Sequence, residues 1–268
     1  MKILADLYPG GKRAALTMSY DDGTIHDKRL VEIFNQNRIK GTFHLNSATM
    51  TEPNKGRVTL DEIPSLYKGH EVSCHTSTHP LPEAVPDTTW VNEIIEDRRR
   101  LEAACGYTVR GMSYPYGHYS DRAIDILRAC GMRYSRTTRA TNNFAAPEDF
   151  MKWHPTTHHK GNLVGLFDAF MERTKRYLCH DILYIWGHSY EFNNDNNWNV
   201  IEDFCAYAKD REEIWYATNI EIYDYIMASR ALMVGVDGKT VYNPSALAVW
   251  VHADGDVVEL KPGENKLA

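Results

Sequence analysis

One stretch of this chain is decisive for its fold: Glu71-Val72-Ser73-Cys74-His75-Thr76-Ser77-Thr78-His79-Pro80. An apolar, β-prone run ends at Cys74, and two histidines four residues apart follow it. On one helical or tight helical turn, two imidazoles at this spacing can reach the same metal ion. Taken alone, such a pair is often only a pair of surface or packing residues. A metal site therefore needs a further ligand from another part of the chain.

An acidic motif supplies that ligand: Ser19-Tyr20-Asp21-Asp22-Gly23, which also follows an apolar run. Asp-Gly after a strand is commonly just a polar turn. Together with His75 and His79, however, Asp22 completes a three-ligand set that leaves positions open for water and substrate. Because consecutive residues at a strand end point in different directions, we expect Asp21 and Asp22 to have different roles. An unligated carboxylate beside a metal can take a proton from water, which indicates a metal-assisted hydrolase.

Short β-prone runs alternate with helical patterns along most of the chain. The expected strands are 14–19, 41–45, 70–74, 111–114, 132–136, 182–186 and 214–217, and helical periodicity lies between them. This alternation indicates βαβ units and a parallel sheet. About seven such units would close, or nearly close, a barrel. Catalytic groups then belong at the carboxyl ends of the strands, where the polar motifs of this chain occur.

The character of the sequence changes after Leu232. Residues 234–260 are β-type, and Asp237-Gly238 and Asp254-Gly255 are expected as two-residue hairpin turns. We therefore predict a catalytic domain over residues 1–230 and a small C-terminal β-rich appendage over residues 231–268, packed on the barrel.

Composition narrows the classes of partner. The chain has 268 residues, 43% hydrophobic and 25% charged, and a net charge of -6. This length suits one large domain, and the charge gives no basic surface for nucleic acid and no reason to expect an anionic membrane as partner. The first twelve residues do not read as a signal peptide, and no apolar run is long enough to span a bilayer. Five scattered cysteines without a CxxC motif indicate buried thiols in a reducing compartment, so we expect a cytoplasmic protein.

The motifs resemble those of the polysaccharide deacetylase family (carbohydrate esterase family four, including nodulation-type chitooligosaccharide deacetylases). Tyr20-Asp21-Asp22-Gly23 matches the first motif, and the stretch from Gly69 to Pro80 matches the second. The segment Lys40-Gly41-Thr42-Phe43-His44-Leu45-Asn46 looks like the second strand of that family, and the similarity extends from about Ala14 to about Met227. The resemblance implies a distorted (β/α) barrel of seven strands. It also implies that Asp21 is the catalytic base and that Asp22, His75 and His79 hold a divalent metal.

The third motif departs from the family pattern. It stands as Ser113-Tyr114-Pro115-Tyr116-Gly117, with Ser113 where the family usually has arginine. By the resemblance, the backbone N–H of Tyr116 shares the oxyanion with the metal. We hypothesise that Arg136, at the end of the next expected strand, supplies the missing guanidinium to Asp21. The alternative is a solvated arginine on a loop.

The last motif is Leu183-Tyr184-Ile185-Trp186-Gly187-His188-Ser189. The resemblance makes His188 the general acid that protonates the leaving amine, and an imidazole suits this role near neutral pH. Trp186 stands where the family usually has leucine, so we expect the floor of the substrate groove to differ. A further cluster, His154, His158 and His159, has no carboxylate within its run, and we interpret it as a loop beside the site.

These observations predict a metal-dependent hydrolase that removes N-acetyl groups from an amino-sugar-containing oligo- or polysaccharide by attack of metal-bound water. Zinc is the metal expected from the ligand types, and Co²⁺, Ni²⁺ or Mn²⁺ also suit them. The alternative on the same barrel is a hydrolase of another non-peptide C–N bond, in a ureide, a cyclic imide or a small acylated amine. A carbohydrate-binding protein whose catalysis has decayed is a third interpretation. The sequence does not indicate an oligomeric state.

Overall fold

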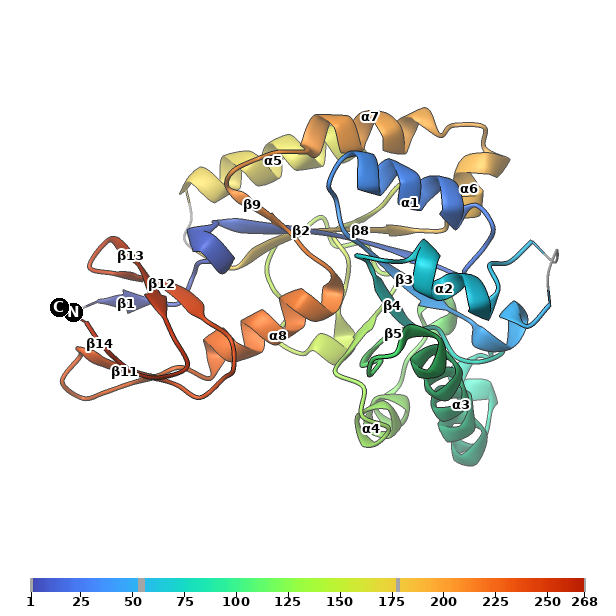
Figure 1. Cartoon of the computed structure of the whole chain (residues 1–268), viewed down its shortest axis with the longest axis horizontal. Coiled ribbons are helices and arrows are strands. Elements are labelled where there is room, and N and C mark those ends of the chain that lie inside the picture. The colour runs from blue at the N-terminus through green and yellow to red at the C-terminus, as the bar shows by residue number, and fades with distance from the viewer. Residues whose placement is uncertain (1, 53–55, 177–178, 268) are drawn as a thin grey trace.

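Parallel strands curl around a common axis at the centre of the molecule (Figure 1). The computed structural model describes residues 2–52, 56–176 and 179–267. The strands of this sheet are β2 (Ala14–Asp21), β3 (Gly41–Leu45), β4 (Glu71–Cys74), β5 (Gly111–Ser113), β6 (Tyr134–Arg136), β7 (Thr157–His158), β8 (Asp181–Gly187) and β9 (Ile214–Tyr216). Their order is β6-β5-β4-β3-β2-β8-β7, and β9 pairs with β2. The predicted distorted barrel of about seven parallel strands is confirmed.

The two end strands of this order approach each other through the segment before β7. Trp153 forms a parallel bridge with Arg136 of β6, and β7 pairs in parallel with β8. The segment thus links β6 to β8 and nearly closes the ring. The sequence missed β7, which has only two residues, and counted the segment at 214–217 as the seventh strand. That segment does form β9, but β9 lies against the first half of β2 rather than in the ring.

Strand β2 is a central strand of the sheet, and all eight of its residues are buried. It pairs with β8 along seven residues, while β9 and β3 share its other edge. Parallel strands buried on both faces are expected to be mainly apolar, and β2 fits this apart from the buried hydroxyls of Thr17 and Ser19 before its final Asp21. Its polar end, Asp21, therefore lies where the carboxyl ends of the neighbouring strands meet.

Helices cover the outside of the strands. The α-helices are α1 (Asp27–Gln36), α2 (Ile63–Leu66), α3 (Asp87–Cys105), α4 (Asp121–Ala129), α5 (Leu163–Arg176), α6 (Ser189–Asn194), α7 (Asn199–Ala208) and α8 (Asn219–Arg230). In Figure 1, α1, α5 and α7 lie above the strands, while α3 and α4 lie below. Their apolar faces pack on the strands and form the main core, which includes Phe34, Trp90, Leu127 and Phe167.

The buried carboxylate of Glu71, the first residue of β4, connects the start of α8 to the amino-terminal end of the barrel strands. Glu71 Oε2 accepts hydrogen bonds from Thr42 Oγ1 at 3.0 Å and from the Ile220 N–H at 2.9 Å, and Oε1 accepts one from Tyr134 Oη at 2.7 Å. Burial raises the pKa of Glu71 to about 7, although these hydrogen bonds oppose the shift. The polar groups inside this end of the barrel therefore satisfy one another and fix the first turn of α8.

The predicted C-terminal β appendage is present, and it recruits the N-terminus. Its strands are β10 (Met233–Val234), β11 (Thr240–Asn243), β12 (Val249–Ala253), β13 (Asp256–Leu260) and β14 (Gly263–Lys266). They form two small antiparallel sheets, one of which also contains β1 (Ile3–Leu4). Strands β1 and β14, from opposite ends of the chain, both belong to this appendage at the left of Figure 1. The division at residue 230 stays a prediction.

The two expected hairpin turns differ. Ala253 pairs with Asp256, so Asp254-Gly255 is the predicted two-residue turn. Asp237-Gly238 instead lies within a longer connection between Val234 and Val241. This prediction was wrong because the Asp237 carboxylate accepts hydrogen bonds from the backbone N–H groups of Lys239 and Thr240, which stabilise a wider loop.

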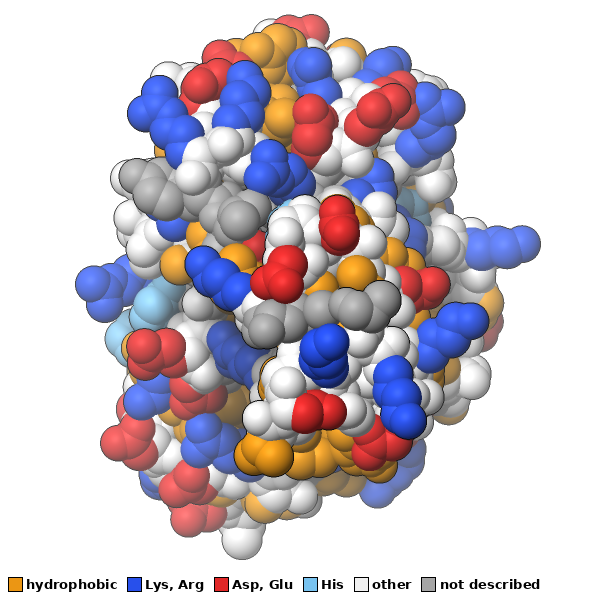
Figure 2. Space-filling view, turned by 90° about the vertical axis from the view of Figure 1, so that its left-hand side faces the viewer, with side chains coloured by type: hydrophobic (Ala, Val, Ile, Leu, Met, Phe, Trp, Pro, Cys, Tyr) orange, Lys and Arg blue, Asp and Glu red, His pale blue; other side chains and the backbone are white. Residues whose placement is uncertain are grey.

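The described residues on the face at the appendage end carry charges of both signs. Figure 2 shows acidic and basic side chains interspersed over it, with hydrophobic side chains exposed between them. Within the described ranges, none of the helices combines the length and the apolar character needed to cross a membrane.

Candidate active site

The polar motifs meet at one rim of the barrel, at the carboxyl ends of the strands. Asp21 is the last residue of β2, Ser113 of β5 and Arg136 of β6, while His75 directly follows β4 and His188 directly follows β8. This is the rim at which barrels of parallel strands carry their reactive groups. The fold thus brings together residues that are up to 167 positions apart in the sequence.

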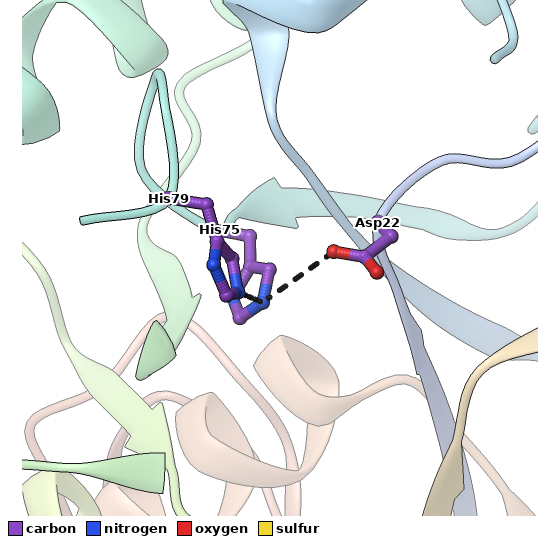
Figure 3. A group of neighbouring side chains, drawn as sticks. All are labelled: Asp22, His75 and His79. Atoms are coloured by element: carbon purple, nitrogen blue, oxygen red, sulfur yellow. Dashed lines mark hydrogen bonds and ion pairs between the residues drawn. The ribbon is translucent and has the colours of Figure 1, made fainter. Parts of the chain in front are cut away.

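Asp22, His75 and His79 form a compact group of donor atoms (Figure 3). His75 Nε2 lies 3.1 Å from His79 Nε2 and 3.9 Å from Asp22 Oδ1. The Asp22 carboxylate faces the two imidazoles from the opposite side (Figure 3). In a tetrahedral zinc site with metal–nitrogen bonds of about 2.0–2.1 Å, two ligand nitrogens are separated by about 3.3 Å. These three side chains therefore fit one metal ion.

The two histidines do not lie on a helical turn, so this part of the prediction was wrong. Thr76 and His79 have φ values of 66° and 64°, in the left-handed region. Asp22 and Tyr116, at 82° and 59°, are there too. Residues other than glycine adopt this conformation only when their surroundings hold them there, and such strain is concentrated at functional sites. Four such residues at one rim indicate that the backbone is shaped to aim particular groups inward.

Ser113 sets the orientation of His75. The Ser113 carbonyl accepts a hydrogen bond from His75 Nδ1 at 2.8 Å, which leaves the lone pair of Nε2 directed toward Asp22 and His79. Burial lowers the pKa of His75 to about 4, against the opposing effect of the Asp21 and Asp22 charges. A neutral imidazole with a fixed tautomer is the form that binds a metal.

Helix α3 supports the loop that holds these histidines. Asp97 accepts hydrogen bonds from the N–H groups of His75 and Ser47, at 3.0 and 2.8 Å. Glu93 accepts two from Thr78, through its N–H and its hydroxyl. Asn46 donates to the carbonyls of His75 and Thr76. The bonds to His75, Thr76 and Thr78 constrain the 75–79 loop directly, and the Ser47 N–H orients Asp97, so the donor atoms are held in place by the scaffold.

Asp21 is buried inside the barrel, and its Oδ2 lies 3.8 Å from His75 Nε2. Its Oδ2 accepts a hydrogen bond from Arg136 Nη2, and its Oδ1 lies 3.3 Å from the Ser113 hydroxyl. Ser113 and Arg136 are register partners on β5 and β6, so Arg136 reaches Asp21 from the strand beside the serine. Arg136 is completely buried, and its guanidinium carbon lies 4.4 Å from the centre of the Trp186 ring. Such a stacked, ion-paired arginine is not a solvated loop residue.

The charges around Asp21 keep it ionised. Burial alone would raise its pKa, but Arg136 and then His75, His44 and His188 hold the pKa well below its usual range. His44, its register partner on β3, is fully buried, and burial lowers the pKa of this imidazole to about 3. Asp21 is therefore ionised across the working range of most enzymes.

Tyr116 lies on the outer side of this group. Its side chain is exposed, and its ring centre lies 4.5 Å from that of His79. The positive φ of Tyr116 is followed by one at Gly117, where an added Cβ would lie 2.1 Å from Thr138 Oγ1. The tight Tyr116-Gly117 turn thus requires glycine at its second position. It presents the Tyr116 backbone beside the histidines.

His188 is held by Glu191, a residue that sequence reasoning missed. Glu191 Oε2 lies 3.1 Å from both the backbone nitrogen and Nδ1 of His188. Burial lowers the pKa of His188, but the hydrogen bond to Glu191 and the charges of Asp21 and Asp22 outweigh it and raise the pKa above its usual value. The i, i+3 spacing at the start of α6 is the pattern of a capping box, which was the available signal.

The second histidine cluster is divided in space. His154 Nδ1 lies 2.6 Å from the Thr137 hydroxyl, whereas His158 and His159 contact Glu191 at 3.1 and 3.5 Å. The run itself holds no carboxylate, as expected from the sequence, and the acidic partner of these two residues comes from α6. His159 also packs on Gly187, where a Cβ would lie 2.0 Å from its Nδ1. Residues 157–158 form strand β7.

The comparison with known families bears out the resemblance to polysaccharide deacetylases that the motifs carry. Residues 9–135 match the family model described as polysaccharide deacetylase. A curated relative, the chitooligosaccharide deacetylase of Sinorhizobium fredii, is 27% identical over 118 residues, which are 43% of this chain and 53% of that protein. The chain thus spans about half the length of this relative.

Solved structures share the fold. A candidate polysaccharide deacetylase from Mycobacterium smegmatis aligns with a TM-score of 0.63 at 14% identity, over 83% of this chain and 93% of that chain. The CE4 domain of a multidomain xylanase from the hindgut metagenome of Trinervitermes trinervoides aligns with a TM-score of 0.53 at 14% identity, over 80% and 91%. At these identities, the similarity establishes a common architecture.

The donor geometry predicts tight metal retention. After dialysis against metal-free buffer, we expect the purified protein to keep about one divalent metal ion per chain. His79→Ala should reduce the metal content at least tenfold, because the ion loses one of three protein ligands. Elemental analysis measures this content.

The matched control is His118→Gln, which changes an exposed histidine close to the same rim in sequence but outside the donor group. It should keep the metal content of the parent. Equal retention by His79→Ala and the parent would contradict the assignment of the three ligands.

Proposed function

We propose that this chain is a metal-dependent hydrolase that removes N-acetyl groups from an amino-sugar-containing oligo- or polysaccharide. The observation that carries the proposal is the contact between two groups at one rim. A buried carboxylate, Asp21, is ion-paired with Arg136 and lies 3.8 Å from His75, which is itself part of the Asp22–His75–His79 donor group. A proton acceptor beside a metal-binding triad is the arrangement that water-dependent cleavage of an amide requires.

Asp21 acts as the general base. Its low pKa keeps it ionised, and Arg136 and Ser113 hold its two oxygens in fixed directions. A positioned carboxylate removes a proton from the water molecule that attacks the acetyl carbonyl. Asp21 ends β2 and Asp22 follows it with a positive φ, so the base binds Arg136 and Ser113 while the next carboxylate faces the two imidazoles.

Asp22, His75 and His79 would hold a divalent cation, with zinc favoured by the donor types, and this ion would supply Lewis acidity to the carbonyl and to water. The N–H of Tyr116 stabilises the negative charge that develops on the acetyl oxygen. His188 protonates the departing nitrogen, so acetate and a free amine leave. Glu191 fixes the His188 ring through Nδ1 and directs Nε2 toward the reacting groups.

Two substitutions distinguish the substrate region from the family pattern. Ser113 replaces an arginine and Trp186 replaces a leucine, and both now contact or support the Asp21–Arg136 pair. We infer that they preserve the chemistry of the base while changing the floor of the groove. The name of the Sinorhizobium fredii relative favours a soluble chitooligosaccharide as the first substrate to examine.

The test is acetate release from N-acetylated amino sugars, from monosaccharide through oligomers to polymer. We expect release from at least one of the longer substrates. Asp21→Asn should reduce the rate by about 10²–10⁴-fold, because it removes the general base while keeping the size of the side chain. Denaturant unfolding of the variant is measured alongside, because Arg136 loses its buried counter-charge. The rate is measured by a coupled assay for acetate.

Asp61→Asn is the matched control, since Asp61 lies at the start of a short helical turn (Leu60–Glu62) outside the catalytic group. It should retain the rate of the parent. If a metal-loaded parent released no acetate from any of these sugars, the deacetylase assignment would be wrong, and ureides, cyclic imides and small acylated amines would be examined next.

The Glu191–His188 contact predicts a change in pH dependence. His188 donates a proton, so activity falls as pH rises through its pKa. Glu191 raises this pKa by stabilising the charged ring, so Glu191→Gln should lower it and move the basic limb of the kcat/KM profile to lower pH.

Glu202→Gln is the control, because Glu202 pairs with Arg29 on the outside of the barrel. Its profile should coincide with that of the parent. A basic limb at the same pH in Glu191→Gln would contradict the role of His188 as the acid, or its stabilisation by Glu191.

A further inference from the structure

Glu191 contacts imidazoles from two neighbouring strands at the edge of the site. His188 follows β8, and His158 ends β7 on the neighbouring strand. His188 Nδ1 and His158 Nε2 each lie 3.1 Å from Glu191 Oε2. The donor atoms of all three residues lie within 4.8 Å of one another, as do those of Asp22, His75 and His79. The rim therefore holds two groups with the same composition, two imidazoles and one carboxylate.

The second group is open to solvent. The side chains of His158, His188 and Glu191 are 24%, 22% and 18% exposed. An ion from solution can therefore reach them and keep water in its remaining coordination positions. Carboxylate and imidazole donors in this ratio suit borderline divalent cations, above all zinc.

We propose that His158, His188 and Glu191 form a second, weaker divalent-metal site whose occupation inhibits the enzyme. The metal-binding part stands on the geometry alone, whereas the inhibition rests on the proposed function, in which His188 is the general acid. A cation on Nδ1 takes the place of the Nδ1 proton, so His188 could give its remaining Nε2 proton to the leaving amine only by becoming an imidazolate. A neutral imidazole is too weak an acid to do this near neutral pH.

Protons balance in this binding step. The Lys160 N–H donates to His158 Nδ1 at 3.2 Å, so the ring proton of His158 resides on Nε2, facing Glu191. Metal binding moves this proton to Nδ1 and breaks the bond to Lys160. A doubly protonated His188 releases its Nδ1 proton to solvent, and a neutral one carries its proton on Nε2. Inhibition should therefore be weaker at low pH, as proton release on metal binding requires.

The surroundings explain why this site is weaker than the first. Lys160 Nζ lies 3.2 Å from Glu191 Oε1, so a positive charge already neutralises part of the carboxylate. The broken bond between Lys160 and His158 adds a further cost. In the first site, by contrast, the ring orientation of His75 is already fixed by the Ser113 carbonyl. We therefore expect two classes of site with clearly separated affinities.

The experiment is a zinc titration of metal-free protein, in which calorimetry and equilibrium dialysis measure the binding. The parent should bind one ion tightly and a second at least tenfold more weakly. His158→Gln should retain the first class and weaken the second at least tenfold, because a carboxamide is a poor zinc ligand. Asp22→Asn should show the converse.

His252→Gln is the matched control, since His252 pairs with Asp6 at 2.9 Å in the appendage, away from the rim. It should bind both ions as the parent does. In the same series, excess zinc should inhibit acetate release by the parent and by His252→Gln, with the inhibition constant raised at least tenfold in His158→Gln.

A parent that binds only one zinc ion, or a His158→Gln protein that keeps the second class unchanged, would overturn the proposal. The hydrogen-bonded cluster would then be purely structural. Two classes of binding without acetate release would leave the second site standing and count against the proposed function instead, so the two failures are distinguishable.

Discussion

The buried ion pair between Asp21 and Arg136 is the interaction on which the rest of the site depends. Both side chains are almost completely removed from water, so each charge is stable only beside the other. Losing one partner of such a pair costs about 3–5 kcal/mol of folding stability. Because Asp21 ends the central strand and Arg136 ends the strand next to the ring closure, the pair also spans the barrel. The same contact thus stabilises the fold and keeps the Asp21 carboxylate ionised.

Ser113 and Trp186 connect this ion pair to the other groups of the rim. Ser113 contacts Asp21 with its hydroxyl and His75 with its carbonyl, and so couples the base to the metal-binding group. Trp186 packs against the Arg136 guanidinium and also contacts the His158 ring in a T-shaped arrangement. The two positions that depart from the family pattern are therefore the ones that connect the Asp21–Arg136 pair to its neighbours. This explains how an arginine can move from one strand to the next without disturbing the metal-binding group.

Much of this could be predicted from the sequence, because parallel strands place their carboxyl ends together. The positions of Asp22, His75 and His79 follow from that rule, and Arg136 could be proposed for the same reason. The left-handed turn through Thr76 and His79 could not, since these residues have no intrinsic preference for it and tertiary contacts impose it. Strand β7 is too short to give a periodic pattern. The contact between His158 and Glu191 depends on the pairing of β7 with β8, and the spacing of the two residues in the sequence matches no motif that would predict it.

The account is tested most directly by moving the guanidinium between the two register partners. Arg136→Ser alone should destabilise the protein by about 3–5 kcal/mol in denaturant unfolding, because it leaves Asp21 buried without a partner. It should also strongly reduce acetate release. Adding Ser113→Arg returns a guanidinium to the neighbouring strand, and the double variant should recover much of both properties. An Arg136→Ser protein that unfolds and releases acetate like the parent would contradict the central role of the ion pair.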